Sequence, residues 1–264
     1  MSLLKLLLDI LYPPRCPFCG SLPGKVSNKS SLQAALSIET AGVNNFSEDD
    51  CSLREIFLER EQIICPRCAE ELPWIEKACG RCGRPLEQGA GNCSYCRGAY
   101  FYFDDCCALS LYRGEVRRAV HLLKYHGKRP LAVPLGKLLS LKLARMPWIS
   151  TVKCLVPVPL HPERLKLRGY NQSSLLAEVI GKELHLPVLE ALVRVRDTGS
   201  QTGFNKIQRR NNLRGAFECS RALEQGSHVL LVDDVLTSGA TADEASFSLK
   251  RGGAARVSVA VLAR

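Results

Sequence analysis

The segment from His228 to Arg251 constrains the fold of this 264-residue chain more than any other part of the sequence. It begins with the apolar run HVLLVDDV, which predicts a strand that is buried on both faces. A short polar turn follows, and residues 240–251 then have the pattern of a helix that ends before Gly252 and Gly253. A buried strand that leads through a short turn into a helix is typical of a parallel α/β sheet.

The remainder of the second half predicts the same architecture. Strands are expected at 107–112, 152–160, 228–235 and 255–263, and helices at 114–125, 131–146, 171–184 and 240–251. Because the two kinds of element alternate, we expect a parallel sheet covered by helices on both faces. This α/β domain should span 99–264. An N-terminal module should span 1–98, with a polar insertion at 21–60 that contains one short helix near 53–61.

The turn after the strand at 228–235 has the composition of a phosphate site. Its residues are Thr237, Ser238, Gly239, Ala240 and Thr241. In an open α/β sheet, ligands bind outside the carboxyl ends of the strands. A helix N-terminus there offers unpaired N–H groups and the positive end of its dipole, and Gly239 lets the backbone approach an anion closely. The turn is therefore a candidate phosphate loop.

Two adjacent acids, Asp233 and Asp234, precede this turn. Carboxylates beside a phosphate site are useful if they accept hydrogen bonds from the vicinal hydroxyls of a ribose. They are equally useful if they hold a divalent cation that the ligand shares. The alternative is an acidic helix cap that binds no ligand. The combination of an apolar strand, two acids and a hydroxyl- and glycine-containing turn favours a ligand site.

Two basic segments accompany this loop. The first, LVPVPLHPERLKLRGYNQ at 155–172, follows a predicted strand with a loop at Val158 and Pro159 and then brings Arg164 and Arg168. The planar fork of arginine binds phosphate oxygens in bidentate fashion, although a basic amphipathic turn is the alternative. The second, at 194–217, is long and polar. It predicts a lid or a disordered loop, and Arg209 and Arg210 are candidates to reach the ligand when the lid closes.

Thirteen cysteines are present, and eight of them form four CxxC pairs. Ten residues separate the second pair from the third, and ten separate the third from the fourth. This spacing indicates two structural Zn²⁺ sites, each with four cysteine ligands. We expect the first pair to combine with the second and the third with the fourth, with a cross-braced arrangement as the alternative. The expected ligands are Cys16, Cys19, Cys65, Cys68, Cys79, Cys82, Cys93 and Cys96.

The formal charge of +10 is unevenly distributed. Residues 1–103 contain 11 Lys/Arg and 12 Asp/Glu, a net charge of −1, whereas residues 104–264 contain 25 and 14, a net charge of +11. A small polyanion or a nucleic acid would suit the basic half, and a solvated basic surface is the alternative. Lys5 and Asp9 interrupt the apolar N-terminus, so we expect no transmembrane segment and a cytoplasmic location.

The segment VLLVDDVLTSGAT closely resembles the signature loop of type I phosphoribosyltransferases. Together with VPVPL, RGYNQ, RRNNLRGAF and the four CxxC pairs, it makes the chain similar to the ComF family, a competence-associated phosphoribosyltransferase-like family. The resemblance implies that Asp233 and Asp234 bind the ribose hydroxyls of 5-phosphoribosyl pyrophosphate and that Thr237–Thr241 bind its 5′-phosphate. It also implies that the loop at Val158 and Pro159 contacts the pyrophosphate, with Mg²⁺ as cofactor.

The same resemblance implies a role in the use of imported DNA during natural competence. Single-stranded DNA and the DNA-uptake machinery are the partners that it suggests. We therefore expect a phosphoribosyltransferase whose acceptor is unknown. The alternative is a non-catalytic protein that handles single-stranded DNA and retains the phosphoribosyl site. Oligomeric state is not indicated by the sequence.

Overall fold

A computed structural model of the chain describes residues 16, 19, 21, 65–86, 91–198 and 206–264. The chain forms two compact units, Met1–Pro73 and Trp74–Arg264. A domain boundary after residue 98 stays a prediction. The insertion at 21–60, apart from residue 21, and the short helix expected near 53–61 lie outside the described residues.

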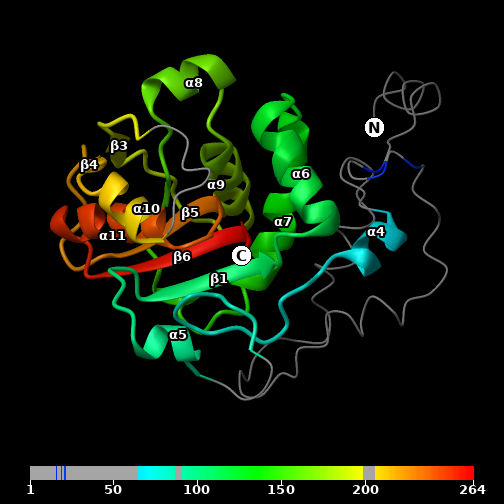
Figure 1. Cartoon of the computed structure of the whole chain (residues 1–264), viewed down its shortest axis with the longest axis horizontal. Coiled ribbons are helices and arrows are strands. Elements are labelled where there is room, and N and C mark those ends of the chain that lie inside the picture. Colours follow the sequence, from blue (N-terminus) through cyan, green and yellow to red (C-terminus); the bar gives the residue numbers. More distant parts are fainter. Residues whose placement is uncertain (1–15, 17–18, 20, 22–64, 87–90, 199–205) are drawn as a thin grey trace. The chain divides into compact units, whose positions relative to one another are not determined.

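The larger unit is built on a four-stranded parallel sheet (Figure 1). Its strands are β1 (Asp105–Ser110), β2 (Cys154–Pro157), β5 (His228–Val235) and β6 (Arg256–Ala263), in the spatial order β1-β6-β5-β2. The central strands pair over most of their length, with Leu231 opposite Val259. Both β5 and β6 are buried along nearly all of their residues, as expected for a sheet that is covered on both faces.

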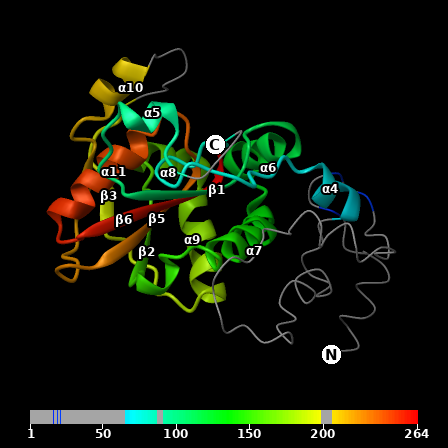
Figure 2. The ribbon, with the colours of Figure 1, turned by 90° about the horizontal axis from the view of Figure 1, so that it is seen from below.

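Four helices of similar length flank this sheet: α6 (Gly114–Tyr125), α7 (Ala132–Leu143), α9 (Gln172–Glu183) and α11 (Ala240–Arg251). Figure 2 shows α11 on one face of the sheet and α7 and α9 on the other. Helices α7 and α9 pack closely at Gly136, which has no side chain. A Cβ atom at this position would lie only 2.7 Å from Cγ1 of Val179, on α9. The predicted α/β class, with a parallel sheet and helices on both faces, is confirmed.

Several short elements complete the described structure. They are α4 (Pro66–Glu71) in the smaller unit, and α5 (Ser94–Arg97), η1 (Arg129–Leu131), η2 (Ile149–Thr151), α8 (Pro162–Arg168), β3 (Leu192–Arg194), α10 (Lys206–Leu213) and β4 (Phe217–Cys219) in the larger one. Strands β3 and β4 form a separate antiparallel pair.

Two of these helices correct the sequence analysis, which expected only loop or turn at both places. The first is α8, which His161 caps by accepting from the Glu163 N–H and which ends at Gly169 in the left-handed region, with φ +76°. It buries no side chain, so it carries no periodic apolar pattern from which it could be predicted. The second is α10, which occupies 206–213 of the predicted lid.

Among the residues that the structure describes, none of the helices combines the length and the apolar character that crossing a bilayer requires.

Candidate functional site

The two loops that were predicted to bind phosphate groups lie side by side at the carboxyl edge of the sheet. Strands β2 and β5 pair in parallel, with Pro157 opposite Val232. The pairing continues one residue further, because the Val158 N–H donates to the Val232 carbonyl at 2.9 Å. Val158 and Pro159 are buried next to the last residues of β5, which include Asp233 and Asp234 and lead into the second loop. The fold therefore brings together two segments that are 75 residues apart in the sequence (158 to 233).

Both acids at the end of β5 are buried, with Asp233 8% exposed and Asp234 3% exposed. The Oδ1 atom of Asp233 accepts from the hydroxyl of Ser173, on α9, at 3.1 Å and from the Asp234 N–H at 2.8 Å. The Oδ1 atom of Asp234 lies 2.7 Å from Nζ of Lys124, near the end of α6. Lys124 and Ser173 escaped the sequence analysis, since each is contributed by a helix remote in sequence from the acids.

Burial and neighbouring charges shift the pKa values of two residues in this cluster. Burial, followed by the neighbouring charge of Asp234, raises the pKa of Asp233 to about 7. Burial opposes the charge of Lys124, yet Asp234 and then Asp233 raise the pKa of this lysine. Within the described part of the chain, the buried Oδ2 atom of Asp234 has no hydrogen-bond partner. The acid pair thus retains an acceptor that a bound hydroxyl group would satisfy.

The candidate phosphate loop connects the acid pair to α11. Gly239 is the N-cap residue of α11 and has φ +88°, a conformation that favours glycine. The Ser238 hydroxyl accepts from the Ala240 N–H at 3.3 Å, and the Gly239 carbonyl accepts from the Asp243 N–H at 2.8 Å. Thr237 is exposed, and Ser238 and Thr241 are half-buried. Their hydroxyls thus accompany the N–H groups of the first helical turn, a suitable site for an anion.

The arginines that were predicted to bind pyrophosphate lie on two helices. Arg164 and Arg168 are on α8, where Arg164 Nε is 3.9 Å from the carboxylate of Asp197 and Arg168 donates to the side chain of Gln172. Arg209 and Arg210 fall within α10, and their side chains lie outside the described structure. The approach of these four arginines to a ligand stays a prediction.

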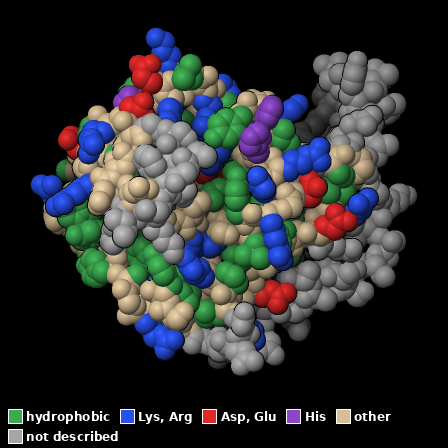
Figure 3. All heavy atoms as spheres, viewed as in Figure 1, with side chains coloured by type: hydrophobic (Ala, Val, Ile, Leu, Met, Phe, Trp, Pro, Cys, Tyr) green, Lys and Arg blue, Asp and Glu red, His purple; other side chains and the backbone are tan. Residues whose placement is uncertain are grey.

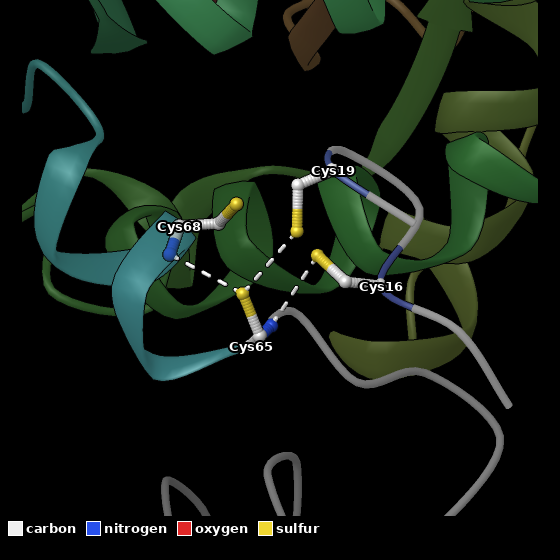
Figure 4. Close-up of side chains that lie close together, drawn as sticks. All are labelled: Cys16, Cys19, Cys65 and Cys68. Atoms are coloured by element: carbon white, nitrogen blue, oxygen red, sulfur yellow. Dashed lines mark hydrogen bonds between the residues drawn. The ribbon is translucent and has the colours of Figure 1, made fainter. Parts of the chain in front are cut away.

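Four cysteines of the smaller unit form the first metal-type cluster (Figure 4). The sulfur atoms of Cys19 and Cys65 are 3.6 Å apart, and backbone N–H groups donate to the sulfurs of Cys16 and Cys65 at 3.4 and 3.5 Å. Cys65 is also the N-cap residue of α4. Hydrogen bonds, chiefly from Ser21, lower the pKa of Cys19 to about 6. These hydrogen bonds favour the thiolate form of Cys19, the form that binds metals, whereas burial raises the pKa of Cys68.

The second cluster belongs to the larger unit and consists of Cys79, Cys82, Cys93 and Cys96. Cys82 and Cys93 have sulfur atoms 3.6 Å apart, and the Cys93 N–H donates to the sulfur of Cys79 at 3.3 Å. Burial opposes ionisation of Cys79, yet backbone N–H groups, first that of Cys93, lower its pKa to about 7. Burial raises the pKa of Cys82 and of Cys96, so this cluster, like the first, combines a thiol of lowered pKa with thiols of raised pKa.

Both clusters have the dimensions of a zinc site. Within each of them, the four sulfur atoms lie within 4.8 Å of one another. Tetrahedral zinc with Zn–S bonds of about 2.3 Å requires sulfur atoms that are about 3.8 Å apart. The structure therefore confirms the expected grouping of the first pair with the second and of the third with the fourth, rather than the cross-braced alternative. Four sulfur ligands leave no open position, so a zinc ion in either cluster would be structural.

The remaining described cysteines lie outside the two clusters. Cys106, Cys107 and Cys154 are buried, Cys219 is half-buried, and Cys51 lies outside the described residues. Burial raises the pKa of Cys107 to about 11, and it also raises that of Cys106. Such thiols are unreactive at neutral pH.

Several curated proteins are similar to this chain along most of their length. DNA utilization protein YhgH of Escherichia coli (strain K12) is 31% identical over 205 residues, which are 76% of this chain and 90% of that protein. Competence protein F of Haemophilus influenzae is 30% identical over 207 residues, with the same shares. Competence protein ComFC of Bacillus subtilis (strain 168) is 26% identical over 229 residues, which are 84% of this chain and 92% of that protein.

Two other comparisons add less. No protein-family model matches the chain. Among solved structures, glutamine phosphoribosylpyrophosphate amidotransferase from B. subtilis, in complex with ADP and GMP, aligns with a TM-score of 0.38 and 17% identity over 54% of this chain and 30% of that one. A TM-score this low does not establish a shared fold. The curated relatives do establish the family, because this chain covers 90% of proteins that are 30% identical to it or more. The chain belongs to the family of DNA utilization protein YhgH and Competence protein F, the ComF family.

Proposed function

We propose that this protein binds 5-phosphoribosyl pyrophosphate at the carboxyl edge of its sheet and transfers the phosphoribosyl group to an acceptor that is still unidentified. The observation that carries this proposal is the buried acid pair, which has an unsatisfied acceptor atom directly before a helix N-terminus. Few ligands need a pair of hydroxyl-binding carboxylates beside a phosphate site, and a phosphorylated pentose is one that does.

Of the two roles considered for the acids, the contacts favour ribose binding over direct coordination of Mg²⁺. The ammonium group of Lys124 already neutralises Asp234, at 2.7 Å. The two hydrogen bonds described for Asp233 are both directed at its Oδ1 atom. A hard dication prefers several ionised oxygen ligands that are free of other partners, so this pair, with one oxygen of each acid already engaged, suits ribose hydroxyls better. Mg²⁺ would instead arrive on the ligand's pyrophosphate, whose charge it would help to neutralise.

The other predicted residues have complementary roles in this proposal. Thr237, Ser238, Gly239, Ala240 and Thr241 hold the 5′-phosphate, and the loop at Val158 and Pro159 holds the pyrophosphate. The bond from ribose C1 to the pyrophosphate oxygen breaks, and the pyrophosphate leaves with the electron pair. The acceptor's lone pair forms the new bond to C1, and the acceptor's proton passes to solvent. Arg164, Arg168, Arg209 and Arg210 stabilise the departing charge.

The release of pyrophosphate tests the proposed reaction. The protein would be incubated with 5-phosphoribosyl pyrophosphate, Mg²⁺ and a panel of free bases and DNA. We expect one acceptor to stimulate release, and we expect a variant with Asp233→Asn and Asp234→Asn to release none. If no acceptor stimulates release by a protein that does bind the ligand, the transfer reaction is wrong and only a binding role remains.

A second candidate function, the handling of single-stranded DNA, is favoured by the relatives' names and by one exposed surface. Tyr125, at the end of α6, is 65% exposed. Its ring is 4.9 Å from that of His121, and the guanidinium of Arg168 lies 5.3 Å from its centroid. Figure 3 shows histidine side chains close to Lys and Arg side chains over the α6 region. Exposed aromatic rings among cations can stack bases while the cations contact phosphates. A cytoplasmic role in the use of imported DNA would follow.

Fluorescence anisotropy with a labelled single-stranded oligonucleotide tests this second function. Tyr125→Ala should weaken binding roughly 5- to 100-fold, as expected for the loss of one stacked base. Tyr100→Ala is the matched control, because Tyr100 is equally exposed at 66%. Affinity should fall as salt rises, because each phosphate contact releases counterions. An affinity that is independent of salt, or equal effects of the two substitutions, would refute this surface.

A further inference from the structure

We propose that the second cysteine cluster (Cys79, Cys82, Cys93 and Cys96) positions the phosphate loop, with Arg264 as the positioning residue that joins the two. The identity of the ligand rests on the proposed function. The mechanical connection between cluster and loop rests only on contacts within the larger unit.

Arg264, which follows β6, bonds to both structures at once. Its Nε atom donates to the carbonyl of Cys82, a ligand of the cluster, at 2.7 Å. Its Nη1 atom donates to the carbonyl of Leu236 at 2.8 Å and also to that of Thr237. A single planar guanidinium therefore fixes the turn between two metal ligands relative to the first residues of the phosphate loop. Because this fork is rigid, displacement of one partner changes the geometry of the other.

An aromatic contact connects the same two structures by a second route. Phe101 packs against Gly239, where a Cβ atom would lie 3.1 Å from Phe101 Cε1. The carbonyl of Phe101 accepts from the guanidinium of Arg81 at 2.9 Å, and Arg81 lies between Cys79 and Cys82 in the sequence. The ring of Phe101 is also 6.1 Å from that of Tyr95, which lies between Cys93 and Cys96. Both halves of the cluster thus support the residue that packs under Gly239.

The first turn of α11 is tied to the same segment. The carboxylate of Asp243 accepts from the Tyr102 N–H at 2.6 Å. The cluster is itself anchored to the sheet, because the Cys106 N–H, in β1, donates to the carbonyl of Gly80 at 2.8 Å. A metal ion that holds the four cysteines would restrict the turn at 79–82 and the segment at 93–103 together. Both ends of the phosphate loop would then be held in the geometry of the folded site.

This connection is tested by amide hydrogen exchange of the segment 233–243, measured on the full chain by mass spectrometry. Arg264→Gln should accelerate exchange there about fivefold or more, as expected for the loss of about 1 kcal/mol per hydrogen bond. Cys96→Ser, which removes one ligand of the second cluster, should accelerate exchange of the same segment. Loss of the cluster should weaken both routes, whereas Arg264→Gln leaves the contact of Phe101 in place. Cys96→Ser should therefore accelerate exchange at least as much as Arg264→Gln, and the double variant should exchange little faster than Cys96→Ser alone.

The matched control is Arg256→Gln, at the other end of β6, where Arg256 bonds to Asp105 at 2.8 Å. We expect this variant to lose a comparable set of guanidinium hydrogen bonds without altering exchange at 233–243. The variant Arg264→Gln should retain its full zinc content and should bind 5-phosphoribosyl pyrophosphate at least fivefold more weakly, with Arg264→Lys intermediate. Unchanged exchange at 233–243 in Cys96→Ser or Arg264→Gln would overturn the inference. If the wild-type protein binds no 5-phosphoribosyl pyrophosphate, the proposed function fails, whereas the exchange result still decides this one.

Discussion

At the scale of single residues, the chemistry of the site depends on how Asp233, Asp234 and Lys124 share charge. Two buried acids beside one half-buried ammonium group cannot both be ionised without cost, because burial penalises an unpaired charge. The contacts assign the charge to the Lys124–Asp234 pair, at 2.7 Å. Asp233 is the second acid, which this ion pair leaves unneutralised, and its pKa is raised to about 7. This residue should therefore dominate the pH dependence of the site.

The stability of the protein should reflect that raised pKa. The folded state binds the proton of Asp233 more tightly than the unfolded chain, whose pKa is near the ordinary 3.8. Stability from this group is therefore present at low pH and is lost as pH rises from about 4 through about 7. Asp233→Asn stays neutral, so it should raise the free energy of unfolding by about 1–4 kcal/mol at pH 8 and by less at pH 5. Urea denaturation at both pH values measures this, and a larger gain at pH 5 would contradict the assignment.

The site residues that could be predicted from sequence belong to short contiguous motifs. Those that could not be predicted come from elements that are distant in sequence and meet only in the folded chain. Asp233 and Asp234 could be singled out because strand, acids and turn are contiguous, and the cysteines because CxxC spacing is periodic. Lys124, Ser173 and Arg264 escaped prediction because α6, α9 and β6 meet at the site only in the folded chain. No pattern in the local sequence marks these three residues.

At the scale of elements, the phosphate loop combines a left-handed glycine with close packing. Gly239 has φ +88° and lies against Phe101, whereas Gly215 has φ +68° and nothing within 4 Å of its Cβ position. Both glycines occupy a backbone region that costs about 1 kcal/mol for other residues. Only Gly239 would add a collision with a buried aromatic ring that belongs to the core. The two positions thus separate backbone strain from packing.

Gly239→Ala and Gly215→Ala should therefore differ in thermal unfolding and in ligand binding. We expect Gly215→Ala to cost about 1 kcal/mol and Gly239→Ala about 2–3 kcal/mol, since overpacking adds to strain. Gly239→Ala should also weaken binding of 5-phosphoribosyl pyrophosphate, which calorimetry measures, while Gly215→Ala should not. Equal losses of stability in the two variants would show that the contact with Phe101 is unimportant.

The elements that could be predicted from sequence were those with a continuous apolar run or one apolar face. Strand β5 falls where the apolar run places it, and helices α6 and α11 fall where the apolar periodicity places them, because burial produces both patterns. Helix α8 buries no side chain and depends on its caps, so a loop was expected in its place. Helix α10 could not be predicted because 194–217 is dominated by polar residues.

At the scale of the whole molecule, each of the two compact units contains one cysteine cluster. In the larger unit, Cys79, Cys82 and Cys96 belong to the same hydrophobic core as the sheet. A metal ion in that cluster would therefore stabilise the unit that carries the candidate site. Metal binding is coupled to folding wherever the ligands come together only in the folded chain.

We accordingly expect two zinc ions per chain by elemental analysis. Cys19→Ser and Cys96→Ser should each remove one ion, because they belong to separate clusters. Removal of zinc by a strong chelator should lower the thermal unfolding midpoint, and re-addition of zinc should restore it. Fewer than two ions in the wild-type protein, or the loss of both ions from a single variant, would contradict two closed sites.

Calorimetric titration with 5-phosphoribosyl pyrophosphate and Mg²⁺ tests the central claim most directly. The wild-type protein should bind the ligand, and the variant with Asp233→Asn and Asp234→Asn should show no measurable binding while remaining folded by circular dichroism. The control exchanges another pair of adjacent aspartates, Asp104 and Asp105, for asparagine, because these residues lie at the amino edge of β1. That control should bind as tightly as the wild type. Unchanged affinity in the Asp233/Asp234 variant would contradict the assignment of this site.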